Sequence, residues 1–143
     1  MRSAWRALTL FAYGILLTSC VTHTQDHPVT LSLINAGSLP LHCRLQFGHW
    51  VDRDLGALGP GGATEIAMTQ AAEDGALYVM RADGERQMMI ETIQCARPGD
   101  WFGSFGQVDL GPVRKRPTGT VEASCAAPAG DARVACRLDR LAP

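Results

Sequence analysis

The chain has 143 residues, 46% of them hydrophobic, and its 13 basic and 14 acidic residues give a formal net charge of −1. Because the charges nearly balance, nothing in the composition favours nucleic acid or another polyanion as a partner. The length suits a single domain with one modest hydrophobic core, which excludes a second domain of ordinary size.

The first 20 residues have the charge and hydropathy order of a signal peptide. Arg2 and Arg6 precede an apolar run over residues 7–17, and no acidic residue occurs before Asp26. The 11 residues of this run are about half of the roughly 20 that cross a bilayer as a helix. A cleaved signal is therefore favoured over an uncleaved membrane span.

The apolar run ends in Leu17-Thr18-Ser19-Cys20, which resembles the lipobox of bacterial lipoproteins. The resemblance implies that residues 1–19 are removed and that Cys20 is acylated, which palmitate labelling would detect. Two or three acyl chains would hold the protein durably on a lipid bilayer. Val21 stands where an aspartate often retains lipoproteins in the inner membrane, so we expect the protein on the outer membrane, facing the periplasm.

Residues 20–28 are expected to comprise the lipidated cysteine and a short polar tether, which leaves residues 29–143 for a single folded domain. At about 3.3 Å per extended residue, the tether would reach some 25 Å. The domain would therefore lie close to the lipid surface.

Four cysteines remain once Cys20 is lipidated, namely Cys43, Cys95, Cys125 and Cys136. An even number of cysteines in an oxidising envelope predicts two disulfides, for which three pairings are possible. Zinc is the alternative, but zinc sites need closely spaced pairs of cysteines, and at least ten residues separate these four. We expect neither a metal nor another cofactor.

Alternation of apolar and polar residues predicts about eight short strands, separated by turn sequences such as Asn35–Ser38 and by a glycine-rich connection over Leu55–Gly62. The predicted strands cover residues 29–33, 39–47, 64–68, 76–81, 87–95, 108–110, 120–125 and 133–138. In the second of these, Leu39, Leu41, Cys43, Leu45 and Phe47 are expected to face the core. This pattern favours an all-β sandwich, with a small β-barrel as the alternative.

The order of strand, Asn-x-Gly turn, strand, Leu-Gly-Pro-Gly turn and strand over residues 29–81 resembles bacterial immunoglobulin-like adhesion and envelope modules. The resemblance implies an immunoglobulin-like β-sandwich, here stapled by disulfides.

An enzyme is not expected. His42 and His49 are the only histidines of the domain, and neither has a recognisable nucleophile or acid partner in the sequence. The glycine-rich connection lacks the lysine and hydroxyl residue that complete a nucleotide-binding loop.

Residues 97–106 are the least strand-like stretch, with Trp101, Phe102 and Phe105 among glycines. Two interpretations are open: the rings fold back under a loop as a satellite cluster, or some of them protrude as anchors for a partner. The basic turn at Arg114–Pro117 is expected to be solvated or, near an anionic membrane, attracted to it.

The last two predicted strands suggest the disulfide pairing. A turn centred between Gly130 and Asp131 would place Cys125 opposite Cys136 and Ala123 opposite Leu138, with Val121 near Arg140. Cys43 is then left to pair with Cys95. Glu122 and Ser124 would share the exposed face of this hairpin.

These observations favour a non-catalytic, membrane-anchored envelope lipoprotein that binds a protein or glycan partner or serves as an accessory subunit. A small lipoprotein inhibitor of lysozyme or proteases is the alternative, although the sequence shows no loop signature of such inhibitors.

Overall fold

The computed structural model describes residues 26–80, 87–130 and 132–143. The predicted signal peptide, the lipobox with Cys20 and the turn at residues 82–85 lie outside the described residues. Nine strands occur in the described part. They are β1 (His27–Asn35), β2 (Leu41–Phe47), β3 (Val51–Leu58), β4 (Ala63–Gln70), β5 (Leu77–Met80), β6 (Gln87–Ala96), β7 (Gly106–Val108), β8 (Thr120–Ala126) and β9 (Ala135–Ala142).

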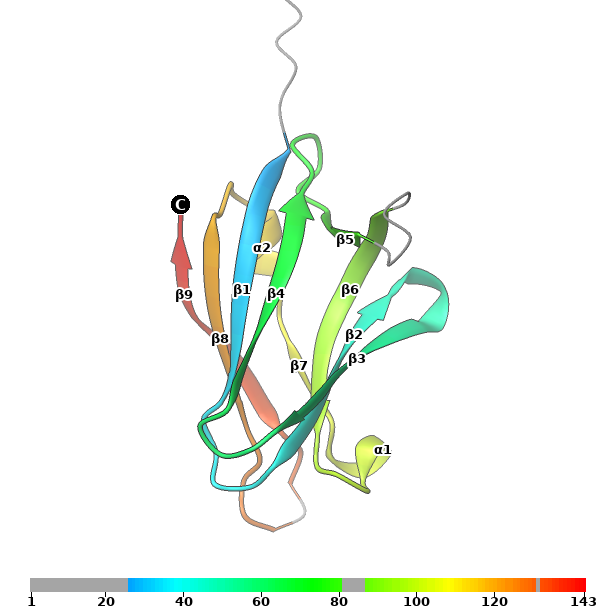
Figure 1. Cartoon of the computed structure of the whole chain (residues 1–143), viewed down its shortest axis with the longest axis vertical. Helices are drawn as coiled ribbons and strands as arrows, with labels where there is room; N and C mark the ends of the chain where they lie inside the picture. The colour runs from blue at the N-terminus through cyan, green and yellow to red at the C-terminus, as the bar shows by residue number, and fades with distance from the viewer. Residues whose placement is uncertain (1–25, 81–86, 131) are drawn as a thin grey trace, which may run out of the picture.

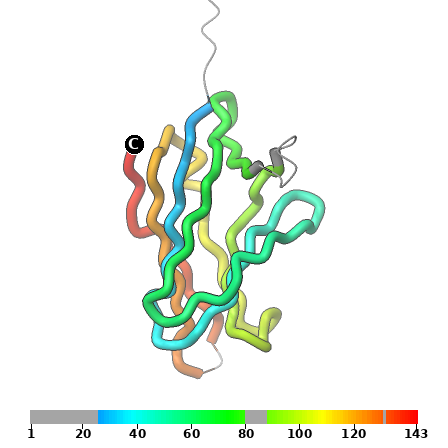
Figure 2. The backbone as a smooth tube through the Cα atoms, viewed as in Figure 1, coloured from blue at the N-terminus to red at the C-terminus, as the bar shows by residue number. Residues whose placement is uncertain are grey.

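Three short helical turns complete the described elements: η1 (Gly48–Trp50), α1 (Trp101–Ser104) and α2 (Gly111–Arg114). The strands follow the order β3-β2-β6-β5-β4-β1-β8-β9, and β7 pairs with β6. Only the β1–β8 pair among these is parallel. The sheet folds over on itself, so that β9, β8, β1 and β4 form one layer and β3, β2, β6 and β7 the other (Figures 1 and 2).

The all-β prediction is confirmed, and the two facing layers fit the sandwich or barrel class. The strand order is not specific to immunoglobulin modules, because β1 lies between β4 and β8. β1 begins at His27, two residues before the predicted strand.

Alternation along the strands builds the core between the layers. In β2, Leu41, Cys43, Leu45 and Phe47 are buried, while His42, Arg44 and Gln46 point outward. Burial of such side chains stabilises the fold by about 1.5–3 kcal/mol each for the larger ones. Leu39 was expected in the same inward row, but it is 40% exposed, because β2 starts only at Leu41.

A buried asparagine explains this late start of β2. Asn35 donates its side-chain amide to the carbonyls of Leu39 and Leu58, both at 2.9 Å, and accepts the amide of Gly37 at 3.0 Å. These bonds fix the corner between β1 and β2, as expected for an Asn-x-Gly turn.

The predicted connection over Leu55–Gly62 is wrong in its first half, because Leu55–Leu58 belong to β3. The β2–β3 register shifts between Cys43 and Arg44, opposite Gly56. Gly56 has a φ of 84°, a left-handed conformation that glycine adopts easily and that suits a β-bulge. The predicted hairpin of β5 and β6 is confirmed by the pairing of Val79 with Met88.

Both predicted disulfides are present. Cys43–Cys95 joins β2 to β6 and Cys125–Cys136 joins β8 to β9, each between directly opposed residues with Cα atoms 4.1 Å apart. The sulfur atoms of Cys95, Cys125 and Cys136 all lie within 4.8 Å of one another. The two disulfides therefore pack against each other across the core, one from each layer.

The closing hairpin differs in detail from its prediction. Ala123 pairs with Leu138 as expected, but a register shift after Glu122 places Val121 opposite Leu141 instead of near Arg140. Ser124 was expected on the exposed face but is only 6% exposed, and its hydroxyl donates a hydrogen bond to the Asp139 carboxylate of β9. The predicted strand at residues 108–110 ends at Val108, since Asp109 accepts the amide of Gly111 at the start of α2.

Removing either disulfide should lower the free energy of unfolding. In the chain-entropy estimate, the loop of sequence separation 11 (Cys125–Cys136) contributes about 3 kcal/mol and the loop of separation 52 (Cys43–Cys95) about 4 kcal/mol. The paired substitutions Cys125→Ala with Cys136→Ala, and Cys43→Ala with Cys95→Ala, test this by urea unfolding. An unfolding midpoint unchanged from the oxidised wild type in either double variant would contradict the expected stabilisation.

Candidate functional site

The outer face of β2 and β3 carries the most organised polar cluster of the described residues, and α1 covers one side of it. Because alternate residues of a strand share a face, the buried Leu41, Cys43 and Leu45 leave their neighbours pointing outward. We call this surface the Trp101 face and define it by His42, Arg44, Asp52, Asp54, Trp101 and Phe102.

Two hollows open on the Trp101 face, and both are lined by His42 and Trp101. One has a volume of about 300 Å³ and is completed by Arg44, Asp52 and Asp54. The other has a volume of about 510 Å³ and is completed by Arg97, Pro98, Gly99 and Phe102. Trp101 therefore presents its indole to a polar hollow and to a more apolar one.

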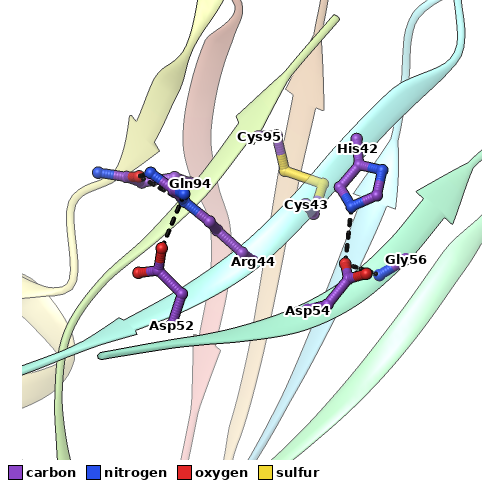
Figure 3. Close-up of polar contacts among 8 residues, drawn as sticks. All are labelled: His42, Cys43, Arg44, Asp52, Asp54, Gly56, Gln94 and Cys95. Atoms are coloured by element: carbon purple, nitrogen blue, oxygen red, sulfur yellow. Dashed lines mark hydrogen bonds and ion pairs between the residues drawn. A yellow bond between two sulfur atoms is a disulfide. The ribbon is translucent and has the colours of Figure 1, made fainter. Parts of the chain in front are cut away.

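Arg44 is held in place by three partners, two of which, Asp52 and Gln94, are drawn in Figure 3. Its Nη1 lies 2.7 Å from Asp52 Oδ2, and its Nε and Nη2 donate to Gln94 Oε1 at 3.1 Å. The guanidinium carbon lies 3.9 Å from the centroid of the Trp101 ring, within the range of a cation–π contact. Arg44 thus links the sheet to α1 and fixes the orientation of the indole.

His42 and Asp54 form a second pair on the same face (Figure 3), with His42 Nε2 2.7 Å from Asp54 Oδ1. The amide of Gly56 donates to the same oxygen at 2.8 Å. The Gly56 amide and then His42 hold the pKa of the Asp54 carboxyl below its ordinary value of 3.8. The sequence suggested no acid partner for His42, because β3, which supplies Asp54, was not recognised as a strand.

The three aromatic residues singled out in the sequence lie differently. Phe102 is 84% exposed, whereas Trp101 and Phe105 are half-buried. The guanidinium of Arg133 lies 5.1 Å from the Phe105 ring, and the His42 ring meets Trp101 edge-on, with centroids 6.3 Å apart. The structure therefore brings Trp101 and Phe102 to the Trp101 face and places Phe105 against Arg133.

Hydrogen bonds fix the turn that presents Phe102. The buried Ser104 accepts the amide of Arg97 at 2.9 Å through Oγ, and Arg97 forms an ion pair with Asp100 at 3.0 Å. The backbone of Ser104 also accepts the amide of Val134 at 2.7 Å. The stretch predicted as a loop is thus a short helical turn tied to the rest of the domain.

The polar side chains of the Trp101 face contact one another. Arg44 lies against Asp52 and His42 against Asp54, so the surface offers fixed hydrogen-bonding groups beside its aromatic rings. Such a surface suits a partner that is recognised by shape, stacking and hydrogen bonds.

Comparisons of the chain with protein-family models, with curated proteins and with solved structures found no match. Within residues 26–80, 87–130 and 132–143, no helix has the length and apolar character needed to cross a membrane.

Replacing Arg44 by methionine should lower the free energy of unfolding by about 1–2 kcal/mol, because the charge-assisted hydrogen bonds and the cation–π contact are lost together. With Trp50 replaced by phenylalanine in both proteins, the Trp101 ring should also be quenched more strongly by acrylamide in the Arg44→Met variant. Arg140→Met is the matched control, because Arg140 is 67% exposed and lies 3.4 Å from Glu122; a change below about 0.5 kcal/mol is expected there. Equal losses in the two variants would contradict the structural role of Arg44.

The lowered pKa of Asp54 predicts a pH dependence of stability. A carboxyl whose pKa is lower in the folded state stabilises the fold above its unfolded value, here 3.8. That contribution is lost as the pH falls through the folded value. Between about pH 5 and about pH 3, Asp54→Asn should therefore lose less stability than the wild type, as urea midpoints would show. The same loss in both proteins would contradict this.

Proposed function

We propose that the protein is a lipid-anchored, non-catalytic module of the bacterial cell envelope that binds a protein or glycan partner through the Trp101 face. The observation that carries the proposal is the 84% exposure of Phe102 on a turn that hydrogen bonds hold rigid. Lipid attachment is proposed from Leu17-Thr18-Ser19-Cys20, with the outer membrane as the favoured location.

The position of Phe102 supports a binding role. A large aromatic side chain left in water costs free energy that burial against a partner would recover. Trp101 lies next to it in the chain, and tryptophan and arginine are among the residues that contribute most to binding at interfaces. Because Arg44 stacks on the indole and is itself held by Asp52 and Gln94, Trp101 would lose little side-chain entropy on binding.

The place of α1 in the fold also supports this role. α1 follows the end of β6 at Ala96, which pairs with His42. β1 starts at His27, paired with Gln70, at the other end of the sheet, and Figure 1 shows α1 and the start of β1 far apart. A tether from Cys20 to His27 would therefore leave the Trp101 face directed away from the bilayer.

Capture of a partner tests the binding proposal. The full-length protein is tagged, crosslinked in intact envelopes and purified, and the captured partner is quantified for the wild type and for Phe102→Ser. Loss of an aromatic anchor should reduce capture by about tenfold or more.

Leu39→Ser is the matched control, because Leu39 is also an exposed apolar residue, at 40%, but lies in the connection between β1 and β2. Capture should be unchanged in this variant. If Phe102→Ser captures the partner as well as the wild type does, binding through the Trp101 face is wrong.

Cys20→Ser tests the anchor. This change should block lipidation and cleavage, so that the precursor accumulates and takes up no labelled palmitate, whereas the wild type is labelled and fractionates with the outer membrane. Normal maturation of Cys20→Ser, together with an unlabelled wild type, would exclude the lipoprotein proposal.

A further inference from the structure

The connection between β2 and β3 exposes a second aromatic side chain. Trp50 is 88% exposed and Val51 is 49% exposed, the highest and third-highest exposures among the large hydrophobic residues described. We call His49, Trp50 and Val51 the Trp50 tip. It forms the end of a hairpin that extends from the body of the sandwich (Figures 1 and 2).

The backbone of the Trp50 tip is strained. His49 has a φ of 64° and Trp50 a φ of 61°, so two successive residues other than glycine occupy the left-handed region. Hairpin turns of this kind normally contain asparagine, aspartate or glycine. Left-handed residues other than glycine cost free energy, and they cluster at functional segments.

The strand registers show at which end of the sheet the Trp50 tip lies. Phe47, the last residue of β2, pairs with Ile90. Tyr78 pairs with Met89, which brings Ile90 level with Leu77. Leu77 pairs with Gln70 and Gln70 with His27. One row of paired residues therefore runs across the sheet from the end of β2 to the start of β1. The Trp50 tip and the N-terminal segment thus lie at the same end of the strands.

Other residues at this end of the sheet are compatible with contact to a lipid surface. Met89, in the strand next to the tip, is 45% exposed. Gln70 donates to the carbonyls of Val113 and Arg116 at 2.8 and 3.0 Å. These bonds hold the basic turn, with its exposed Lys115, at this end of the sheet. The acidic Glu73 and Asp74 line the same hollow as the basic Lys115 and Arg116. Contact of this end of the sheet with lipid would therefore depend on its apolar side chains and not on net charge.

We propose that the Trp50 tip inserts into the lipid–water interface of the membrane that holds Cys20. The inference rests on the proposed lipid anchor. His27 is the seventh residue after Cys20, a reach of about 25 Å when extended, so this end of the sheet stays near the bilayer. Tryptophan is enriched at such interfaces, where its ring is buried and its N–H stays hydrated. A second contact would orient the domain, with the Trp101 face outward.

Tryptophan fluorescence tests this contact in the mature full-length lipoprotein. Cleavage removes Trp5 and leaves Trp50 and Trp101, so Trp101→Phe makes Trp50 the sole reporter. The protein is reconstituted into vesicles of phosphatidylethanolamine and phosphatidylglycerol, with or without bromine on the acyl chains. Brominated lipid should reduce Trp50 fluorescence several-fold. Trp50→Phe is the control, in which Trp101 should keep its full fluorescence.

Vesicle flotation separates the possible failures. If the protein floats with the vesicles and Trp50 is not quenched, the tip does not enter the membrane and this inference is wrong, while the anchor stands. Equal quenching of Trp50 and Trp101 would also overturn it, because the two ends of the domain would not be distinguished. A protein that does not float would refute the anchor and this inference together.

Discussion

The contact between the two disulfides across the core is the constraint on which the rest of the structure depends. Each disulfide joins two neighbouring strands, and the sulfurs of Cys95, Cys125 and Cys136 lie within 4.8 Å of one another. Each layer of this small sandwich is therefore cross-linked where it meets the other, and the sulfurs of the two cross-links pack against each other. By the chain-entropy estimate the two loops contribute about 3 and 4 kcal/mol, which is large beside a typical net stability of about 5–15 kcal/mol.

The same constraint reaches the surface through β2. Cys43 points inward and is bonded to Cys95, while its neighbours His42 and Arg44 point outward and form the base of the Trp101 face (Figure 3). At its other end, β2 passes through the buried Phe47 into the Trp50 tip. A single disulfide-bonded strand thus supports both exposed aromatic surfaces. On the function we propose, one end of this strand lies near the lipid and the other presents the binding face.

Much of the fold was predictable, because local alternation encodes it. The inward row of β2, the β5–β6 hairpin and the pairing of Cys125 with Cys136 all follow from spacing and turn residues. β3 was missed because Gly56 and the charged Asp52 and Asp54 break the expected alternation at a bulge. The His42–Asp54 pair was missed with it. The turn α1 depends on bonds from Ser104 to Arg97 and Val134, and no local pattern in the sequence reports such distant contacts.

The most direct test of this account is a map of the disulfides in the protein purified from its native envelope, with free thiols blocked before digestion and without reduction. The account predicts two linked peptides, Cys43 with Cys95 and Cys125 with Cys136. A peptide that links Cys43 to Cys125 or Cys136, or blocked thiols at all four positions, would contradict it. Either result would remove the fixed contact between the layers and, with it, the rigid support of the Trp101 face.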